Sequence, residues 1–319
     1  MKLSNTMKLS NTMKLSKTIS PSKTTNLHKV LSAIIITLSA TLTAYANSQE
    51  INIQWLGGPT MLIEFGDIYL LTDPMLGEGE EAYIMADPNE NFDLATGPNV
   101  KTHRRLTPLP PVNLQQLDAA LISHTHEDHF DQTARKELPK SLTMITHESD
   151  TQLIRGLGFT NHQSLAWGKQ WHIRKGDFSV TIEAVPAFHT ENPQFKSILG
   201  HGNGYWFEFE HNGWHKTAYW TGDSFLTASV LESLMTKSKP DIFVPHLGRV
   251  GTTGPLGQIS MGADEVIEAI QRLQPRYTLP IHHSTYELYL EPVSELVKKA
   301  QEKELNVDVL AAGSWISYR

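Results

Sequence analysis

The chain has 319 residues, of which 39% are hydrophobic and 19% are charged. This is the composition of a globular protein, which excludes a disordered or fibrous chain, and the length suits one large domain or two small ones. The absence of cysteine excludes disulfide bonds and thiolate metal ligands, so the 15 histidines and 34 carboxylates are the side chains available to bind a metal.

The first 46 residues predict a targeting segment rather than part of the fold. Three tandem copies of a six-residue segment occupy residues 1–18 and could reflect alternative starts of translation. A basic stretch precedes the apolar run 30–43, and Ala44-Tyr45-Ala46 follows it. This order is typical of a secretory signal peptide. The run is shorter than the roughly 20 apolar residues of a membrane-spanning helix, so we expect cleavage after Ala46, with an uncleaved anchor as the alternative.

The expected mature chain is acidic. Residues 1–46 hold six lysines and no acidic residue, so their removal leaves 21 basic against 34 acidic side chains and a net charge of −13. No basic stripe offsets this charge, which argues against a nucleic-acid partner. We therefore expect a periplasmic or secreted protein with no stable membrane anchor and no nucleic-acid partner.

Short apolar runs bounded by turn residues predict the strands of the first half. These runs are 51–56, 61–65, 68–72, 119–123 and 142–146. Residues 77–111 are rich in Gly, Pro, Asn and acidic residues and predict a long surface loop, a kind of loop that is often functional. A helix is expected near 150–157.

The second half returns to a β pattern before helices and strands alternate. Residues 178–185 alternate apolar and polar side chains, as in a half-buried strand, and a hairpin is expected around Asn212-Gly213. The alternating helices and strands that follow are 226–235, 241–245, 262–273, 277–281, 292–302 and 307–310. Two β-rich blocks, each followed by such units, predict an α/β protein with two packed sheets and helices outside. No change of composition marks a linker, so we treat 47–319 as one domain.

Four ligand-type side chains lie within six residues at the end of the predicted strand 119–123. They are His124, His126, Asp128 and His129. Alternate residues at a strand-to-helix turn point together, so the first two can hold one ion while the second two turn toward another. Mixed His and Asp ligation suits Zn, Mn or Fe. Scattered surface histidines are not spaced this closely, so the four residues together predict a two-metal site.

Three further segments end a predicted strand in a ligand-type residue. His189 follows the strand 178–185, and Asp223 follows Gly222, where backbone and metal can approach closely. His282 and His283 end the strand 277–281. Each segment alone is a weak signal, but together with the first cluster they complete two sets of metal ligands.

The ordered segments HTHEDH (124–129), His189, TGDS (221–224) and PIHH (280–283) resemble the metallo-β-lactamase superfamily over essentially all of 47–319. WLGGPT (55–60) and LLTDP (70–74) are similar to its ascorbate-6-phosphate-lactonase-like branch, which includes the N-acyl-phosphatidylethanolamine phospholipase D. The resemblance implies a four-layer αββα sandwich with the site at one edge of the two sheets. The chain departs from it at Gly58-Pro59-Thr60, where relatives often have a histidine, and at His283, where many have an aromatic residue.

The resemblance also implies roles for individual residues. The first metal would be held by His124, His126 and His189, and the second by Asp128, His129 and His282. Asp223 would bridge the two ions, and Asp73 would orient ligands. His282 is preferred over His283 as the ligand.

These roles predict a metal-dependent hydrolase. Two divalent ions, expected to be Zn with Mn or Fe as alternatives, would lie roughly 3.5–4 Å apart and share a hydroxide that attacks a carbonyl or phosphoryl centre. Asp223 and Asp128 are the candidate catalytic residues, and Asp128 could steer a proton to the leaving group. We expect an exported enzyme that cleaves an ester, lactone or phosphodiester bond of a small molecule.

The same residues also bear on other functions. A β-lactamase acting on amides is less favoured, because a bridging aspartate such as Asp223 is more typical of the phosphoesterase, lactonase and glyoxalase members of the superfamily. A flavodiiron oxidoreductase would have Glu in place of His126, and a nuclease of this fold would need a basic groove. A metal-binding protein without catalysis stays an alternative. His246 and Arg249, after the strand 241–245, could either contact substrate or lie on a surface turn.

Overall fold

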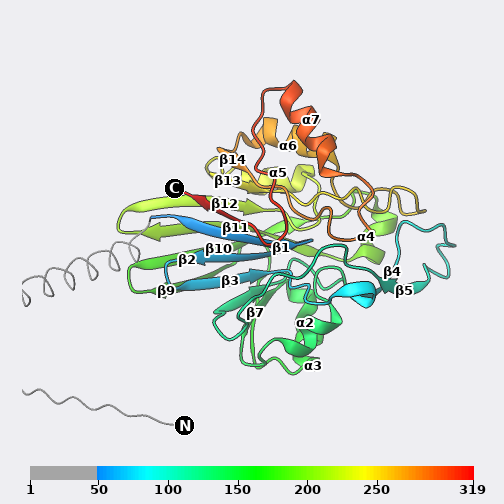
Figure 1. Cartoon of the computed structure of the whole chain (residues 1–319), viewed down its shortest axis with the longest axis horizontal. Coiled ribbons are helices and arrows are strands. Elements are labelled where there is room, and N and C mark those ends of the chain that lie inside the picture. The colour runs from blue at the N-terminus through cyan, green and yellow to red at the C-terminus, as the bar shows by residue number, and fades with distance from the viewer. Residues whose placement is uncertain (1–48) are drawn as a thin grey trace, which may run out of the picture. The chain divides into compact units, whose positions relative to one another are not determined.

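Two β-sheets lie at the centre of residues 49–319, which are the residues that this computed structural model describes (Figure 1). The predicted signal peptide and its cleavage site lie outside the described residues. Within 49–319, no helix is long and apolar enough to cross a membrane.

The first sheet has seven strands and changes from antiparallel to parallel pairing. In spatial order they are β15 (Trp315–Tyr318), β1 (Ile51–Gly57), β2 (Thr60–Phe65), β3 (Ile68–Thr72), β6 (Ala119–Leu121), β7 (Thr143–Thr146) and β8 (Asn161–Ser164). The strands from β15 to β3 pair antiparallel, whereas β3, β6, β7 and β8 run parallel. The carboxyl ends of β3 and β6 therefore meet at one edge of this sheet.

The second sheet has six strands, in the order β14 (Tyr277–Thr278), β13 (Ile242–Val244), β12 (Trp214–Trp220), β11 (Gly202–His211), β10 (Phe178–Ala187) and β9 (Gln170–Lys175). The predicted hairpin is confirmed as β11 and β12. Asn212 and Gly213 both have positive φ, 46° and 81°, as a two-residue hairpin turn of type I′ requires. Strands β12, β13 and β14 run parallel, and β10 has the same direction because β11 pairs antiparallel with both β10 and β12.

Alternate side chains of the second sheet enter two different hydrophobic clusters, as the two-residue period of a strand dictates. In β11, Tyr205 and Phe207 pack into the core between the sheets, while Trp206 packs against the outer helices. In β12, Trp220 faces the inner core and Tyr219 the outer cluster. This alternation explains how one sheet can be covered on both faces.

Helices cover the outer face of each sheet, which gives four layers (Figure 1). The first sheet is covered by α2 (Gln132–Glu137) and α3 (Thr151–Gly156), and the second by α5 (Ala228–Leu234), α6 (Ala263–Leu273) and α7 (Val293–Glu302). Asp131 caps α2, since its side chain accepts a hydrogen bond from the Ala134 amide. The predicted αββα sandwich is thereby confirmed.

The predicted loop 77–111 contains a small sheet of its own. After a 3₁₀ turn, η1 (Gly79–Glu81), strand β4 (Tyr83–Ala86) pairs antiparallel with β5 (Val100–His103). This hairpin lies at one end of the sandwich beside α4 (Pro193–Leu199) (Figure 1). A fourth hydrophobic cluster, which includes Tyr83 and Leu199, fills the space beneath it.

The predicted strand 307–310 is wrong. This segment makes one backbone hydrogen bond to the neighbouring strand, from the Asp308 amide to the Thr278 carbonyl at 2.8 Å, and Val309 is exposed. The chain pairs as a strand only later, in β15, which adds to the edge of the first sheet beside β1. The strands β8, β9 and β15 were also missed; apart from Tyr318, their side chains are exposed or only half-buried.

Candidate metal centre

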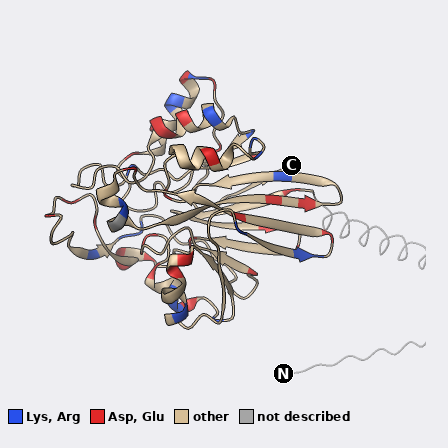
Figure 2. Cartoon of the chain, turned by 180° about the vertical axis from the view of Figure 1, so that it is seen from behind, with Lys and Arg blue, Asp and Glu red and all other residues tan. Residues whose placement is uncertain are grey.

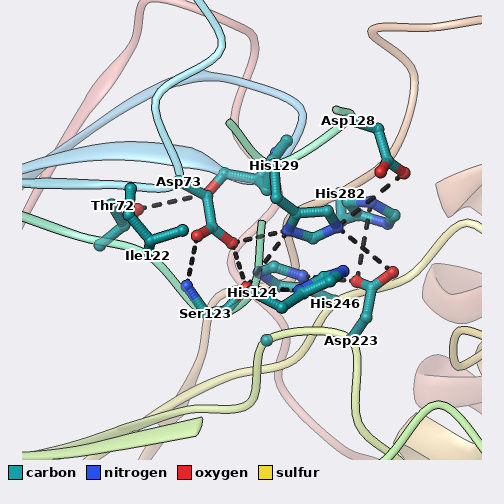
Figure 3. A network of polar contacts seen from close by, with 12 residues as sticks. Thr72, Asp73, Ile122, Ser123, His124, Asp128, His129, Asp223, His246 and His282 are labelled. Atoms are coloured by element: carbon teal, nitrogen blue, oxygen red, sulfur yellow. Dashed lines mark hydrogen bonds and ion pairs between the residues drawn. The ribbon is translucent and has the colours of Figure 1, made fainter. Parts of the chain in front are cut away.

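The ligand-type residues meet because parallel strands deliver them to the same edge of the sandwich. Asp73 follows β3, and the segment 124–129 follows β6. His189, Asp223 and His282 follow the strands of the second sheet that run in one direction. Figure 3 shows the resulting network, in which side chains from both sheets point toward one another.

The backbone is unusual at three points of this edge. Asp73 and His282 have positive φ, 31° and 61°, a conformation that non-glycine residues adopt at a cost and that is concentrated at functional sites. Gly222 also has positive φ, 58°, and a Cβ there would lie 2.8 Å from the Cβ of Ser123. Only glycine can therefore precede Asp223 without moving Ser123 and its neighbours.

The first cluster contains His124, His126 and His189, whose ring nitrogens lie within 4.8 Å of one another. Nε2 of His189 is 3.1 Å from Nε2 of His124. Nδ1 of His189 lies 3.0 Å from the Ile259 carbonyl, and donating to it leaves the Nε2 lone pair free. Burial lowers the pKa of all three rings, that of His126 to about 3, so they are neutral and able to bind a cation at neutral pH.

The second cluster contains His129, Asp223 and His282. Nε2 of His129 is 3.3 Å from Oδ2 of Asp223, and Nε2 of His282 is 3.7 Å from Oδ1. Nδ1 of His282 lies 2.8 Å from the Leu247 carbonyl, which fixes the tautomer that leaves Nε2 unprotonated. Burial alone would raise the pKa of the Asp223 carboxyl. The neighbouring His282 and His129 nevertheless hold this pKa well below its usual range.

Asp73 lies behind the second cluster, as the resemblance implied. Its Oδ2 is 2.7 Å from Nδ1 of His129. Ser123 donates to Asp73 twice, from its amide to Oδ1 and from its hydroxyl to Oδ2, both at 2.6 Å. Burial alone would lower the pKa of His129, but the carboxylates of Asp223, Asp128 and Asp73 together raise it well above its ordinary value.

His246 belongs to the same cluster by distance, yet its ring nitrogens are already engaged. It is fully buried, so the alternative of an exposed surface turn is wrong. Nε2 accepts a hydrogen bond from Nε1 of Trp220 at 2.6 Å, which leaves Nδ1 protonated to donate to Oδ1 of Asp223 at 2.8 Å. With its lone pair taken by Trp220, His246 positions Asp223 and does not itself offer a metal ligand. Arg249 instead pairs with Glu291 at 3.0 Å.

Asp128 stands slightly apart from both clusters. Its Oδ2 is 3.9 Å from Nε2 of His129, and Figure 3 shows its carboxylate facing that ring. Burial raises its pKa to about 7. Its assignment as a ligand stays a prediction.

His283 points away from the clusters. Its ring packs on Trp55, with centroids 4.5 Å apart, and its Nε2 lies 3.3 Å from the Pro280 carbonyl. The structure thus brings His282, and not His283, to the metal-binding edge.

The chemistry of these donors fits divalent metal ions. Nε2 of His129 and of His282 are buried but make no hydrogen bond with any residue of 49–319, although carboxylate oxygens lie nearby. Such orphaned nitrogens are costly unless a cation accepts their lone pairs. Two nitrogens that bind one zinc ion at about 2.0–2.1 Å in tetrahedral geometry lie about 3.3 Å apart, close to the 3.1 Å between His124 and His189.

Sequence reasoning missed two contributors to this edge. The role of His246 was left open, although it follows a strand of the same sheet just as Asp223 and His282 do. Tyr289 was assigned no role, yet its ring packs on His282 with centroids 4.5 Å apart. No spacing rule in the sequence links Tyr289 to the site, because a turn of the chain brings it back over His282.

Comparison with known proteins agrees with this geometry. A family model for the β-lactamase superfamily domain matches residues 70–283, about two thirds of the chain. The N-acyl-phosphatidylethanolamine-hydrolyzing phospholipase D 1 of Caenorhabditis elegans is 24% identical over 290 residues, which cover 86% of this chain and 77% of that protein. The UPF0173 protein YddR of Bacillus subtilis is 24% identical over 268 residues, which cover 84% of this chain and 99% of that protein.

A solved structure shares the fold. The possible metal-dependent hydrolase from Veillonella parvula is 20% identical, with a TM-score of 0.67 over 83% of this chain and 98% of its own. The family match spans every strand end that carries a residue of the two clusters. The chain therefore belongs to the metallo-β-lactamase superfamily of metal-dependent hydrolases.

Proposed function

We propose that this chain is an exported hydrolase that binds two divalent metal ions in the two clusters and cleaves an ester, lactone or phosphodiester bond. The observation that carries the proposal is the fixed orientation of the imidazoles. Hydrogen bonds to Nδ1 of His129, His189 and His282 leave Nε2 of each ring free, which is the arrangement that metal-binding histidines require.

His124, His126 and His189 would hold one ion, and His129, His282 and Asp128 the other. The position of Asp223 between the clusters supports the bridging role, because its Oδ2 lies 3.3 Å from Nε2 of His129 and 3.9 Å from Nδ1 of His189. Its Oδ1 is fixed by His246. Two bound divalent ions supply Lewis acidity and activate water at neutral pH.

The chain's own residues supply the rest of the proposed chemistry. Ser123 and Ser224, two serines beside the clusters, are buried and donate their hydroxyls to Asp73 and to the Phe225 carbonyl, so they serve as structural residues and not as nucleophiles. Asp128 faces the clusters with a pKa that burial raises to about 7. The position of Asp128, with Oδ2 3.9 Å from Nε2 of His129, supports a second role in steering a proton to the leaving group.

The proposal is tested by metal removal and restoration. Purified protein is assayed against p-nitrophenyl acetate, a γ-lactone and bis-p-nitrophenyl phosphate before chelation, after chelation and after reloading with Zn, Mn or Fe(II). We expect hydrolysis of at least one substrate, its loss on chelation and its return on reloading. Hydrolysis that survives complete metal removal would overturn the proposal, and full loading without hydrolysis of any substrate would favour a non-catalytic metal-binding protein.

Export is a separate part of the proposal and rests on the sequence of residues 1–46. The intact mass of the protein recovered from the periplasm or medium should correspond to a chain that begins at Asn47. A mass that retains the apolar run 30–43 would instead favour an uncleaved anchor.

A further inference from the structure

A pocket with a volume of about 390 Å³ opens directly onto the two clusters. Its inner end is formed by His126, His189, Asp128 and Asp223. The volume lies in the lower part of the range of pockets that bind drug-sized molecules, about 300–1,000 Å³. The pocket therefore has room for a small substrate or for one chain of a larger one.

The outer wall of this pocket, which we call the apolar wall, comes from the β4–β5 hairpin, α4 and the loop before α6. Its main side chains are Ile84, Phe92, Leu94, Val100, Ile198 and Leu256. Four of them, Ile84, Leu94, Val100 and Ile198, are exposed by 47–68%. They make up four of the eleven large hydrophobic side chains exposed in residues 49–319. Apolar side chains gathered around an opening mark a binding site more often than scattered ones.

No lysine or arginine is among the described residues that line the pocket, where the carboxylates are Glu127, Asp128 and Asp223. The nearest cation on the hairpin, Lys101, pairs with Asp87 at 2.6 Å and Glu90 at 2.8 Å. Figure 2 shows the loop between β4 and β5 in tan and red without blue. Away from the clusters, the pocket thus has no group to neutralise a negatively charged part of a substrate.

The only lysine on α4 also has a partner, an aromatic ring. The ammonium of Lys196 lies 4.8 Å from the centroid of the Phe188 ring, a cation–π contact. A phosphate or carboxylate remote from the reacting bond would meet apolar side chains here, and burying such a charge without a partner is costly.

We propose, on the basis of the function proposed above, that the substrate is an uncharged ester or lactone whose single apolar chain lies along the apolar wall. Its carbonyl group lies at the clusters. Hydrolysis breaks the acyl C–O bond, the hydroxyl of water joins the acyl carbon, and the remaining proton goes to the leaving oxygen. The products are a carboxylic acid and an alcohol, or one hydroxy acid from a lactone.

The experiment measures kcat/KM for p-nitrophenyl esters from acetate to octanoate and for γ-lactones with matching side chains. Each methylene buried on the wall should raise kcat/KM about fourfold, equivalent to about 0.8 kcal/mol, until the pocket is full. An ester of the same length that ends in a carboxylate should be slower by about tenfold or more. No dependence on chain length, or a preference for the charged ester, would overturn the inference while leaving the proposed function intact.

Two matched variants locate the effect. Leu94→Asp places a charge on the apolar wall and should flatten the chain-length dependence. Leu153→Asp makes the same change at an exposed leucine of α3, outside the pocket, and should leave that dependence unchanged. Equal slopes in both variants would contradict the role of the wall.

Binding without catalysis separates this inference from the proposed function. Metal-free protein should bind 1-octanol more tightly than 1-butanol by calorimetry, and Leu94→Asp should remove the difference. If no ester, lactone or phosphodiester is hydrolysed, the proposed function fails, and equal binding of the two alcohols would then overturn the inference as well.

Discussion

The two sides of the pocket are built in different ways. On the inner side, strand ends of both sheets fix the ligand-type side chains, and three of the rings that face the clusters are held at Nδ1 by a second partner. Asp73 holds His129, and backbone carbonyls hold His189 and His282. On the outer side, the apolar wall is a hairpin and a short helix laid over the end of the sandwich, and four of its side chains are exposed.

This difference indicates that reaction chemistry and substrate choice are carried by separate parts of the chain. The inner side depends on buried strands whose register cannot shift without disturbing the core. The hairpin is fastened through its loop, where Asn89 donates to the Leu288 carbonyl at 2.9 Å and accepts from the Gly251 amide at 2.7 Å. It is also fastened through the backbone of Ile84, whose amide and carbonyl bond to the Gln132 side chain at 3.2 and 2.8 Å. The wall can therefore change its side chains without moving the clusters.

The largest effect is expected at Asp223, which belongs to the second cluster and lies 3.9 Å from Nδ1 of His189 in the first. Asp223→Ala should lower kcat/KM by about a thousandfold or more, since metal-dependent stabilisation is worth several kcal/mol, and should reduce bound metal. Metal analysis and kinetics check both. Glu268→Gln is the control, because that carboxylate forms an exposed ion pair with Arg272 on α6. A fully active, fully loaded Asp223→Ala would show that the clusters do not share this carboxylate.

A smaller loss of metal affinity is expected from a change at Asp73, which lies behind the metal ligands. Asp73→Asn removes the carboxylate that orients His129 and should weaken metal affinity by about 10–100-fold. Competition with a chelating dye measures this change. Unaltered affinity would mean that Ser123 and the surrounding backbone suffice to hold the ring.

A change at His246 tests whether this residue positions Asp223 or binds a metal ion itself. Because Trp220 occupies its Nε2, His246→Gln should keep the metal content of the wild type while lowering kcat by about tenfold or more through a misplaced Asp223. Metal content and kcat are measured on the same preparation. Loss of one ion per chain would show that His246 is a ligand after all.

Metal binding on the inner side of the pocket should also depend on pH. Neighbouring carboxylates raise the pKa of His129 well above its ordinary value, so a proton competes with metal for Nε2 at and below neutral pH. Metal affinity should therefore fall as pH falls, by about tenfold per unit for one displaced proton. Affinities measured at pH 6, 7 and 8 check the sign, and an affinity that rises as pH falls would contradict it.

The smallest effect on stability and metal binding is expected from the wall. Leu94→Asp should change the free energy of unfolding by less than about 0.5 kcal/mol, as is usual for exposed positions, and should leave metal affinity unchanged. Denaturant unfolding checks this. A marked loss of metal would show that wall and clusters are coupled, and would remove the distinction between the two sides.

The sequence predicted the buried elements well and the peripheral ones poorly. The strand 178–185 showed its alternation because one face packs fully in the core, whereas β9 was not recognised although Trp171 and Ile173 alternate with polar residues, since both are only half-buried. The hairpin inside 77–111 was also missed, since Val100 and Lys101 of β5 are exposed and give no apolar period. Burial produces the pattern from which a strand is predicted, so elements without burial escape detection.

The same reason limits prediction of the site. His124, His129 and Asp223 stand at strand ends in short, dense motifs, so their approach could be expected from parallel topology alone. The hydrogen bond from Trp220 to His246 depends on neighbouring strands lying in one particular register, and the apolar wall depends on how a loop folds over the edge. Neither has a local signal in the sequence.

The most direct test of the central claim is metal stoichiometry coupled to hydrolysis. Metal-free protein is reloaded with zero to three equivalents of zinc, passed through a desalting column, and measured for bound zinc and for ester, lactone and phosphodiester hydrolysis. Two ions bound per chain, with hydrolysis that reaches its maximum as the second binds, is the predicted result. Hydrolysis that does not depend on bound metal, or failure of wild-type protein to retain any ion, would contradict the two-cluster account.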